Sequence, residues 1–388
     1  AYLTQVGSAL HGKNITMIAE LMALPCSNNR QFSNEDKQLI STIKHDKNLG
    51  RTVYNNLRVD QAISEVVTLR LQSLVSLYDK DYEEAYRFVH GAHNGLFSFM
   101  ESNIDFPFLA KLLAKLAENL RIIASLADDS KLEREKLSST CLRECQNSIT
   151  RSFTLVAKDR LPITDPYNKK SNIFSITNTL FKIYFKLNTL QLMGKIIKLI
   201  DTPSIMNNIK LFPLCDVVTY KFYLGRLALF EDRLEDARES FQFALKYTPY
   251  KSSDNSSSSS SGSHGRDQLH NRQLILASLV PIEMSFGIMP TDIISNTYGL
   301  HELVEIGNAI KCGNLKTFNE IFNKNKVIFI RNGTYLVIEQ LKNLIYRNLF
   351  KKISIIINCT RLNIFTFHNI LKKLQSDNAS PFAGTGTT

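Results

Sequence analysis

The sequence lacks the long apolar run that a transmembrane helix needs. Nowhere do about 18 apolar residues follow one another, and the most apolar cluster, residues 353–357, is far shorter. The chain does not open on a charged segment followed by an apolar one, so we expect no secretory signal and no membrane span. Its six cysteines are scattered through segments of regular apolar periodicity, which indicates reduced thiols in an intracellular protein.

Sequence motifs of catalysis and metal binding are also missing. The chain contains no GxxxxGKS/T loop, no glycine-rich dinucleotide loop and no GxSxG turn. His301 starts an HExxE sequence without the second histidine of zinc proteases, and the pair His90 and His93 has no third ligand. Cys141 and Cys145 share one face of a predicted helix, where we expect buried thiols. We therefore predict a protein that is not an enzyme and uses no cofactor, metal or small-molecule substrate.

Acidic residues are scarce in two segments, and these segments account for the positive charge of the chain. The whole chain carries a net charge of +11. Residues 168–210 hold seven lysines and one aspartate, whereas residues 308–388 hold twelve Lys and Arg and three Asp and Glu. The net charges of +6 and +9 leave the remainder slightly acidic. Two basic segments indicate an anionic partner, either nucleic acid or an acidic polypeptide, and ordinary solvated helix faces are the alternative.

Residues 223–249 follow the second half of the 34-residue tetratricopeptide pattern. The matching positions are Leu224, Gly225, Ala237, Phe241, Ala244 and Pro249. Small residues let two antiparallel helices approach, Phe241 fills the space between them, and Pro249 ends the second helix. Similar turns at residues 77–85 and 309–318, the latter with Gly313 as the helix C-cap, predict a stack of helical hairpins.

Apolar periodicity predicts an all-α chain. We expect a helix pair over residues 1–26, nearly continuous helix over 60–156, and one long helix over 331–357 with apolar groups on two faces. Residues 27–57 are predicted to be polar and irregular. Residues 251–266 are of low complexity and predict a disordered surface insertion. Pro281 predicts a kink or a break in an apolar helix.

Four segments, in the same order, resemble the PCI-domain proteins of nuclear mRNA export, above all the PCI subunit of the transcription-and-export complex two. The initials stand for proteasome lid, signalosome and initiation factor. The segments are TLFKIYFKLNTLQL (179–192), VTYKFYLGRLALFE (218–231), LVPIEMSFGIMPT (279–291) and FIRNGTYLVIEQLKNLIYRNLFKK (329–352). The resemblance runs from about residue 2 to about residue 375, and its most specific part is the last segment.

The resemblance implies a TPR-like helical-repeat stack that leads into a C-terminal winged-helix region. We assign residues 1–165 to N-terminal repeats, 166–330 to the PCI helical-repeat domain, and 331–388 to a junction helix and a winged helix. In the family a recognition helix and a β-hairpin wing follow the helix that corresponds to residues 362–374. The sequence that follows here, SDNASPFAGTGTT, matches neither, so we expect an incomplete winged helix.

The resemblance also implies function. It predicts a non-catalytic adaptor in the nucleus, including the nuclear pore and with some cytoplasmic presence, that couples transcription to mRNA export. The implied partners are a large Sac/GANP-type scaffold subunit, a small acidic DSS-type protein, and RNA or DNA bound with weak sequence preference. Alternatives are a signalosome- or proteasome-lid-associated PCI subunit without a nucleic-acid role, and a helical-repeat peptide receptor such as a chaperone adaptor.

The two basic segments supply the candidate contact residues. For nucleic acid they are Lys342, Arg347, Lys351, Lys352, Arg361, Lys372 and Lys373. These side chains can neutralise phosphates without reading bases, so binding is expected to depend steeply on salt. For protein partners they are Lys182, Lys186, Lys195, Lys198, Tyr346 and Phe350. The first four flank an apolar stripe that includes Ile183 and Ile196, which suits an acidic and apolar peptide. The competing view is that the C-terminal basic surface contacts the scaffold subunit instead of RNA.

Overall fold

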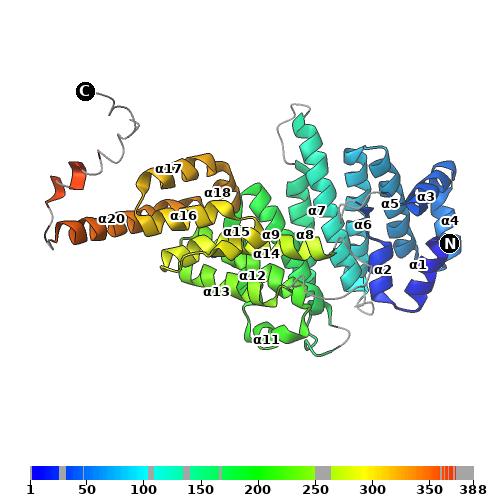
Figure 1. The fold of residues 1–388 in the computed structure, drawn as a ribbon. Helices are drawn as coiled ribbons and strands as arrows, with labels where there is room; N and C mark the ends of the chain where they lie inside the picture. Colours follow the sequence, from blue (N-terminus) through cyan, green and yellow to red (C-terminus); the bar gives the residue numbers. More distant parts are fainter. Residues whose placement is uncertain are drawn as a thin grey trace, which may run out of the picture. The chain divides into compact units, whose positions relative to one another are not determined.

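The computed structural model is helical throughout the part of the chain that it describes (Figure 1). That part comprises residues 2–25, 32–46, 48–103, 109–133, 140–165, 168–249, 264–358, 361, 363–365, 367–369 and 372. These residues contain no strand, which confirms the all-α prediction. The chain divides into two compact units, residues 1–220 and 221–388. The finer division into three domains stays a prediction.

Unit 1 begins with four short helices: α1 (Tyr2–His11), α2 (Ile15–Leu21), α3 (Asn34–His45) and α4 (Leu49–Leu57). The predicted N-terminal helix pair is confirmed, but the prediction of an irregular segment over 27–57 is wrong. A capping box starts α3, because Ser33 Oγ accepts the Asp36 N–H at 3.1 Å and the Asp36 carboxylate accepts the Ser33 N–H at 3.0 Å. Ile40 and Ile43 then anchor α3 in the core.

Four longer helices follow, each packed on the next: α5 (Gln61–Tyr78), α6 (Tyr82–Ser102), α7 (Leu109–Glu133) and α8 (Thr140–Ala157). They confirm the nearly continuous helix predicted over residues 60–156. The apolar residues that recur at helical spacing on α5 and α7 are buried. These residues are Ile63, Val67, Leu71, Leu74, Leu109, Leu112, Leu116, Leu120 and Ile123.

The rest of unit 1 is built around α9, which packs on α7 and α8. The elements are η2 (Lys169–Asn172), α9 (Ile173–Leu187), η3 (Leu190–Leu192), α10 (Met193–Ile200), α11 (Pro203–Met206), η4 (Ile209–Leu211) and the start of α12 (Leu214–Phe230), whose residues after Tyr220 belong to unit 2. Tyr220 of α12 lies between two rings of α9, with its centroid 5.0 Å from that of Phe174 and 5.8 Å from that of Phe181. All three side chains are fully buried, so aromatic packing holds α12 on α9.

Unit 2 contains the remaining helices, which are α13 (Leu234–Tyr247), α14 (His264–Ser285), α15 (Asp292–Tyr298), α16 (His301–Cys312), α17 (Leu315–Lys324), α18 (Lys326–Asn332), α19 (Tyr335–Gln340) and α20 (Lys342–Ile357). The start of α14 at His264 places the last three residues of the predicted insertion in a helix. Residues 250–263 lie outside the described part of the chain. Helix α14 runs through Pro281 without a break, so a break there is ruled out.

Three helical-hairpin turns share one backbone geometry, as their sequences predict. A residue one or two positions after the first helix has a positive φ in each turn: 60° at Lys80, 58° at Asp232 and 67° at Gly313. The N–H of the next residue donates to a carbonyl five residues earlier, which is the bond of a Schellman C-cap. The pairs are Asp81 and Ser76, Arg233 and Ala228, and Asn314 and Ala309. The stack of hairpins is therefore confirmed at these turns.

The hairpin of α12 and α13 is tightly packed where Gly225 meets Phe241. A Cβ on Gly225 would lie 3.0 Å from atoms of the Phe241 ring, tighter than most Cβ contacts in proteins, so the ring would have to shift. Phe241, Ala237 and Ala244 are completely buried, and α13 ends two residues before Pro249. The tetratricopeptide-like residues thus serve packing, as their spacing predicts.

Residues 331–357 do not form the single helix that we predict. The chain leaves α18 at Gly333, whose φ of +74° ends the helix, and the Thr334 N–H donates to the Phe329 carbonyl. A second interruption at Leu341 separates α19 from α20. The apolar groups on two faces are nevertheless present, because Ile345 is buried in unit 2 while Phe350 packs on the segment that follows.

Candidate nucleic-acid and partner interfaces

Helix α20, orange in Figure 1, carries two basic side chains that the fold leaves available. Arg347 and Lys351 are both exposed, and their spacing of four residues places them on one flank of the helix. Neither side chain forms an ion pair or a hydrogen bond with another described residue. Two adjacent, solvated cations on a rigid helix are suited to contact neighbouring phosphates.

Two other members of the predicted nucleic-acid set are engaged within unit 2. The Lys342 ammonium lies 3.6 Å from Glu339 and 5.2 Å from the centroid of the Phe322 ring. The Lys352 ammonium donates a hydrogen bond of 2.7 Å to the carbonyl of Cys312, the last residue of α16. A cation at that position offsets the negative end of the α16 dipole. Both lysines therefore contribute to the fold.

The last members of this set follow α20. Arg361 and Lys372 are exposed, and Arg361 makes contacts within the protein. Lys373 lies outside the described residues. The structure thus brings Arg347 and Lys351 together on one helix flank, while the other predicted residues are engaged elsewhere or belong to later segments.

Tyr346 and Phe350, predicted to contact a protein partner, lie on the second face of α20. Tyr346 is partly buried against unit 2. The Phe350 ring stacks on Phe367, with 3.6 Å between the centroids and 14° between the planes. Leu349, Ile353 and Phe367 form a small buried cluster beside them. The segment after α20 therefore covers part of this face.

In the first basic segment, Lys182 of α9 is half-buried among charged groups. Burial lowers the pKa of its ammonium, and the nearby Arg121 lowers it further, while Glu118 and Asp216 act in the opposite direction. Burial likewise raises the pKa of the Asp216 carboxyl, which Lys182 opposes. These groups come from α7, α9 and α12 and form a charged cluster inside unit 1.

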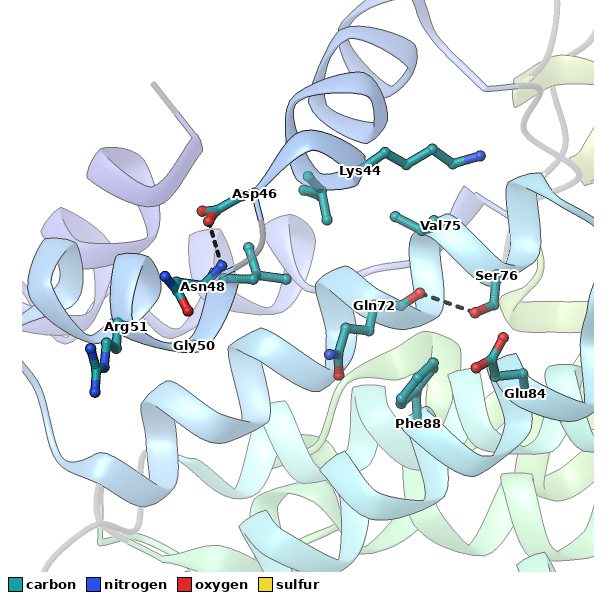
Figure 2. Close-up of a pocket in the computed structure, with 12 residues that line it drawn as sticks. Lys44, Asp46, Asn48, Gly50, Arg51, Gln72, Val75, Ser76, Glu84 and Phe88 are labelled. Atoms are coloured by element: carbon teal, nitrogen blue, oxygen red, sulfur yellow. Dashed lines mark hydrogen bonds between the residues drawn. The ribbon is translucent and has the colours of Figure 1, made fainter.

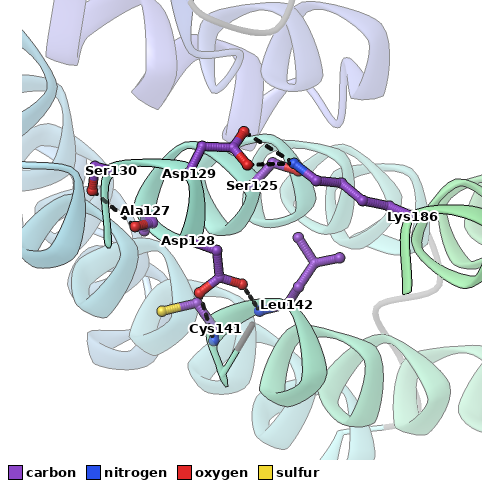
Figure 3. A network of polar contacts seen from close by, with 8 residues as sticks. All are labelled: Ser125, Ala127, Asp128, Asp129, Ser130, Cys141, Leu142 and Lys186. Carbon is purple, nitrogen blue, oxygen red and sulfur yellow. Dashed lines mark hydrogen bonds and ion pairs between the residues drawn. The ribbon is translucent and has the colours of Figure 1, made fainter. Parts of the chain in front are cut away.

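Lys186, one turn further along α9, is held by α7 (Figure 3). Its ammonium lies 3.0 Å from both carboxylate oxygens of Asp129 and 3.0 Å from Ser125 Oγ. The neighbouring Asp128 is buried and accepts the backbone N–H groups of Cys141 and Leu142 at 3.2 and 2.9 Å. Asp128 therefore caps the start of α8. Sequence reasoning missed this role because the capped N–H groups are 13 and 14 residues away from Asp128.

Lys195 and Lys198 of α10 are exposed, and neither pairs with another described residue. Of the apolar stripe predicted beside them, Ile183 and Ile196 are buried in the core, whereas Leu187 and Leu192 are partly exposed. The four lysines of the predicted acidic-peptide surface thus divide into two that unit 1 engages and two that stay solvated.

Cys141 and Cys145 are buried, as predicted. His90 and His93 lie within α6 and face serines of α8, with His90 Nε2 2.9 Å from Ser148 Oγ and His93 Nε2 3.1 Å from Ser152 Oγ. Burial lowers the pKa of His93 to about 4, so its imidazole is neutral at physiological pH. The described residues include no group of three or more His, Cys, Asp or Glu that could hold a metal ion.

A pocket of about 520 Å³ opens beside the connection between α3 and α4 (Figure 2). Some of its polar groups are engaged with one another or with their surroundings. The Lys44 ammonium lies 2.6 Å from Asp79, and an Asp46 carboxylate oxygen accepts the Asn48 N–H at 2.9 Å. The described lining residues include no histidine or cysteine, so no His- or Cys-based catalytic pair forms there.

The described part of the chain contains no helix that is long and apolar enough to cross a membrane. No family model matches the sequence. The chain is 29% identical over 351 residues to the PCI domain-containing protein 2 homolog of Dictyostelium discoideum, covering 89% of this chain and 76% of that protein. It is 26% identical over 376 residues to PCI domain-containing protein 2 of Xenopus laevis, covering 96% and 86%. The resemblance to the PCI-domain proteins is confirmed.

The chain is also 34% identical over 187 residues to the Enhanced ethylene response protein 5 of Arabidopsis thaliana, covering 48% of this chain and 41% of that protein. The helical stack described above is thus a PCI-type stack. The most specific family segment, residues 329–352, spans α18, α19 and the first part of α20. Arg347 and Lys351 lie within it, whereas the winged-helix region beyond α20 stays a prediction.

Proposed function

We propose that this chain is a non-catalytic PCI scaffold subunit of a nuclear mRNA-export complex and that it contacts RNA or DNA through α20. The observation that carries the proposal is the pair Arg347 and Lys351, which is exposed, unpaired among the described residues and held on one rigid flank. Two cations so placed bind backbone phosphates, so the interaction is weakly selective for sequence and weakens as salt rises.

The proposed assembly includes a large Sac/GANP-type scaffold subunit and a small acidic DSS-type subunit, and it works in the nucleus and at the nuclear pore. The family resemblance supports these partners. On this chain the partly exposed Phe350 and the solvated lysines Lys195 and Lys198 are the protein-contact candidates that remain accessible. Copurification from nuclear extract, with mass identification of the partners, tests the assembly.

The nucleic-acid contact is tested by reversing the charges of Arg347 and Lys351 together. Binding of a labelled 20-nucleotide single-stranded RNA is followed by fluorescence anisotropy at several salt concentrations. Loss of two phosphate contacts should weaken binding and flatten the slope of log K against log salt by about 1.4, at ~0.7 per contact. The matched control is the double variant Lys195→Glu and Lys198→Glu, which makes the same change in net charge on α10.

Equal losses in the two double variants would mean that RNA responds only to net charge, and this result would contradict the site. Binding of the scaffold subunit is measured in parallel. If Arg347→Glu with Lys351→Glu abolishes scaffold binding and leaves RNA affinity unchanged, the flank of α20 is a protein interface, and the complex rather than this chain holds the RNA.

A further inference from the structure

The short helix α18 presents an unusual surface to solvent. Only Phe329 is buried in this helix. Val327, Ile328 and Ile330 are exposed, as is Leu336 of α19, each with between 46% and 71% of its surface accessible. Val327 and Ile330 are one turn apart and share a face, and α19 packs directly on α18. We call these four aliphatic residues the α18 face.

Isolated exposed aliphatic residues are normal on proteins, but a group of four is not. Their exposed areas add up to on the order of 400 Å², comparable with the largest apolar patches of soluble proteins, which are often functional. Three of the four are β-branched, and β-branched residues stabilise a solvated helix less than Ala, Leu, Lys or Glu do. The composition of the α18 face therefore needs a reason outside the local structure.

Positive charge lies beside this apolar surface on α18, whereas on α19 Glu339, one turn after Leu336, lies 3.6 Å from the Lys342 ammonium. Lys324, Lys326 and Arg331 are all exposed, and Arg331 lies one turn after Val327 on the same side of α18. The Lys326 ammonium sits 5.7 Å from the centroid of the Tyr335 ring, which places this charge where α18 meets α19. The sequence from residue 321 to residue 338 contains no aspartate or glutamate.

We propose that the α18 face docks an amphipathic segment of another protein, in which acidic residues flank aliphatic ones. Aliphatic side chains pack against the four exposed residues, and carboxylates pair with the surrounding cations. Opposite charges beside an apolar seam fix the register and orientation of two packed helices. The inference concerns a protein contact and stands apart from the nucleic-acid role proposed for α20.

Three other occupants fit the surface less well. Single-stranded nucleic acid stacks on exposed aromatic rings, and the α18 face consists of aliphatic residues. Helices that lie on membranes are usually longer and carry aromatic residues on the apolar side, whereas α18 has seven residues. A symmetric pair of α18 helices from two copies of this chain would bring Lys326 and Arg331 of one copy close to the same two cations of the other, and like charges oppose such a contact.

The test uses the full chain and a labelled 16-residue synthetic peptide with leucines at helical spacing flanked by glutamates. Matched probes are the same peptide with lysine in place of glutamate, phosphatidylserine vesicles and a 20-nucleotide RNA. The variants are Ile330→Ser with Leu336→Ser, and Lys326→Glu with Arg331→Glu. The control variant is Leu211→Ser with Leu214→Ser, two exposed leucines of unit 1.

The glutamate peptide should bind, and its Kd should rise at least tenfold in both α18 variants and stay unchanged in the control. The lysine peptide should not bind. Because the substituted side chains are exposed, the thermal midpoint should not change, which shows that lost binding is not lost folding. The proposal would be overturned if the glutamate peptide did not bind, or if its Kd were unchanged in the α18 variants. It would also be overturned if vesicles or RNA bound instead, in a way that depends on the α18 residues.

Discussion

The two basic segments of this chain have similar charge, and each divides into cations that the fold engages and cations that it leaves solvated. Lys195 and Lys198 are solvated in the first segment, and Lys342 and Lys352 are engaged in the second. In residues 168–210, Lys182 is half-buried in a charged cluster and Lys186 is paired with Asp129. In residues 308–388, Arg347 and Lys351 have no partner among the described residues. Net charge along a sequence therefore does not locate a binding site. A cation that already pairs within its own protein contributes less binding free energy to a partner, because the new contact must replace an existing one.

The largest expected effect concerns the hairpin that supports unit 2. Phe241→Ala removes a completely buried ring that packs on Gly225. The free energy of unfolding should fall by about 3–5 kcal/mol through lost burial and a cavity, and all partner binding should weaken together. Urea unfolding measures this loss, with Phe230→Ala, at an exposed phenylalanine, as the control. If Phe241→Ala abolished the binding of one partner and left the free energy of unfolding unchanged, Phe241 would have a ligand-binding role instead of a packing role.

Acidification should destabilise unit 1 through His93. The pKa of His93 is about 4 in the folded chain, whereas the ordinary value of a histidine, which applies to the unfolded chain, is 6.5. The unfolded state therefore binds the proton first as the pH falls. The contribution of neutral His93 to the free energy of unfolding is fully present above pH 6.5. Between pH 6.5 and pH 4 it is lost by up to ~1.4 kcal/mol per pH unit. Urea unfolding at pH 7 and pH 5 should show the loss, and His93→Gln should reduce it.

The exposed His368 provides the matched control for this pH effect. His368→Gln makes the same substitution at an exposed site, and its unfolding at pH 7 and pH 5 is measured beside that of His93→Gln. Identical pH dependences of the unchanged chain and of His93→Gln would show that His93 is not the group that responds.

The charged cluster of unit 1 offers a sharper test of the comparison. Lys182→Glu places a third carboxylate near Glu118 and Asp216 in a half-buried site. The free energy of unfolding should fall by roughly 2 kcal/mol, because like charges repel where water screens them poorly. Lys195→Glu, on exposed α10, should change it by no more than ~0.5 kcal/mol. Equal effects of the two substitutions would remove the distinction between engaged and solvated lysines.

The smallest effect is expected at the ion pair of Lys186 and Asp129. Both side chains are about half exposed, at 44% and 58%, so water and salt screen their attraction. Lys186→Met should cost ~0.5 kcal/mol or less, and added salt should reduce the difference between the two proteins. A loss of several kcal/mol at high salt would show that Lys186 belongs to the buried cluster with Lys182.

Local patterns in the sequence predict much of this fold. Helical periodicity identifies the buried stripes of α5 and α7, and the turn sequences identify hairpins even where the residue with positive φ is Lys80 or Asp232. The start of α3 was also encoded locally, in Ser33 and Asp36, although the polar composition around it obscured the signal. Over residues 331–357 the apolar pattern continues across Gly333, so periodicity alone does not reveal the interruption.

The availability of the basic residues was decided by tertiary structure. The sequence by itself determined that two segments are rich in lysine and arginine and that their helices have a solvated side. It could not determine that Lys186 meets Asp129, 57 residues earlier, or that Lys352 meets the carbonyl of Cys312, 40 residues earlier. Such contacts depend on how the helices pack rather than on spacing within one helix, and so only the folded chain separates Arg347 and Lys351 from the lysines that it holds.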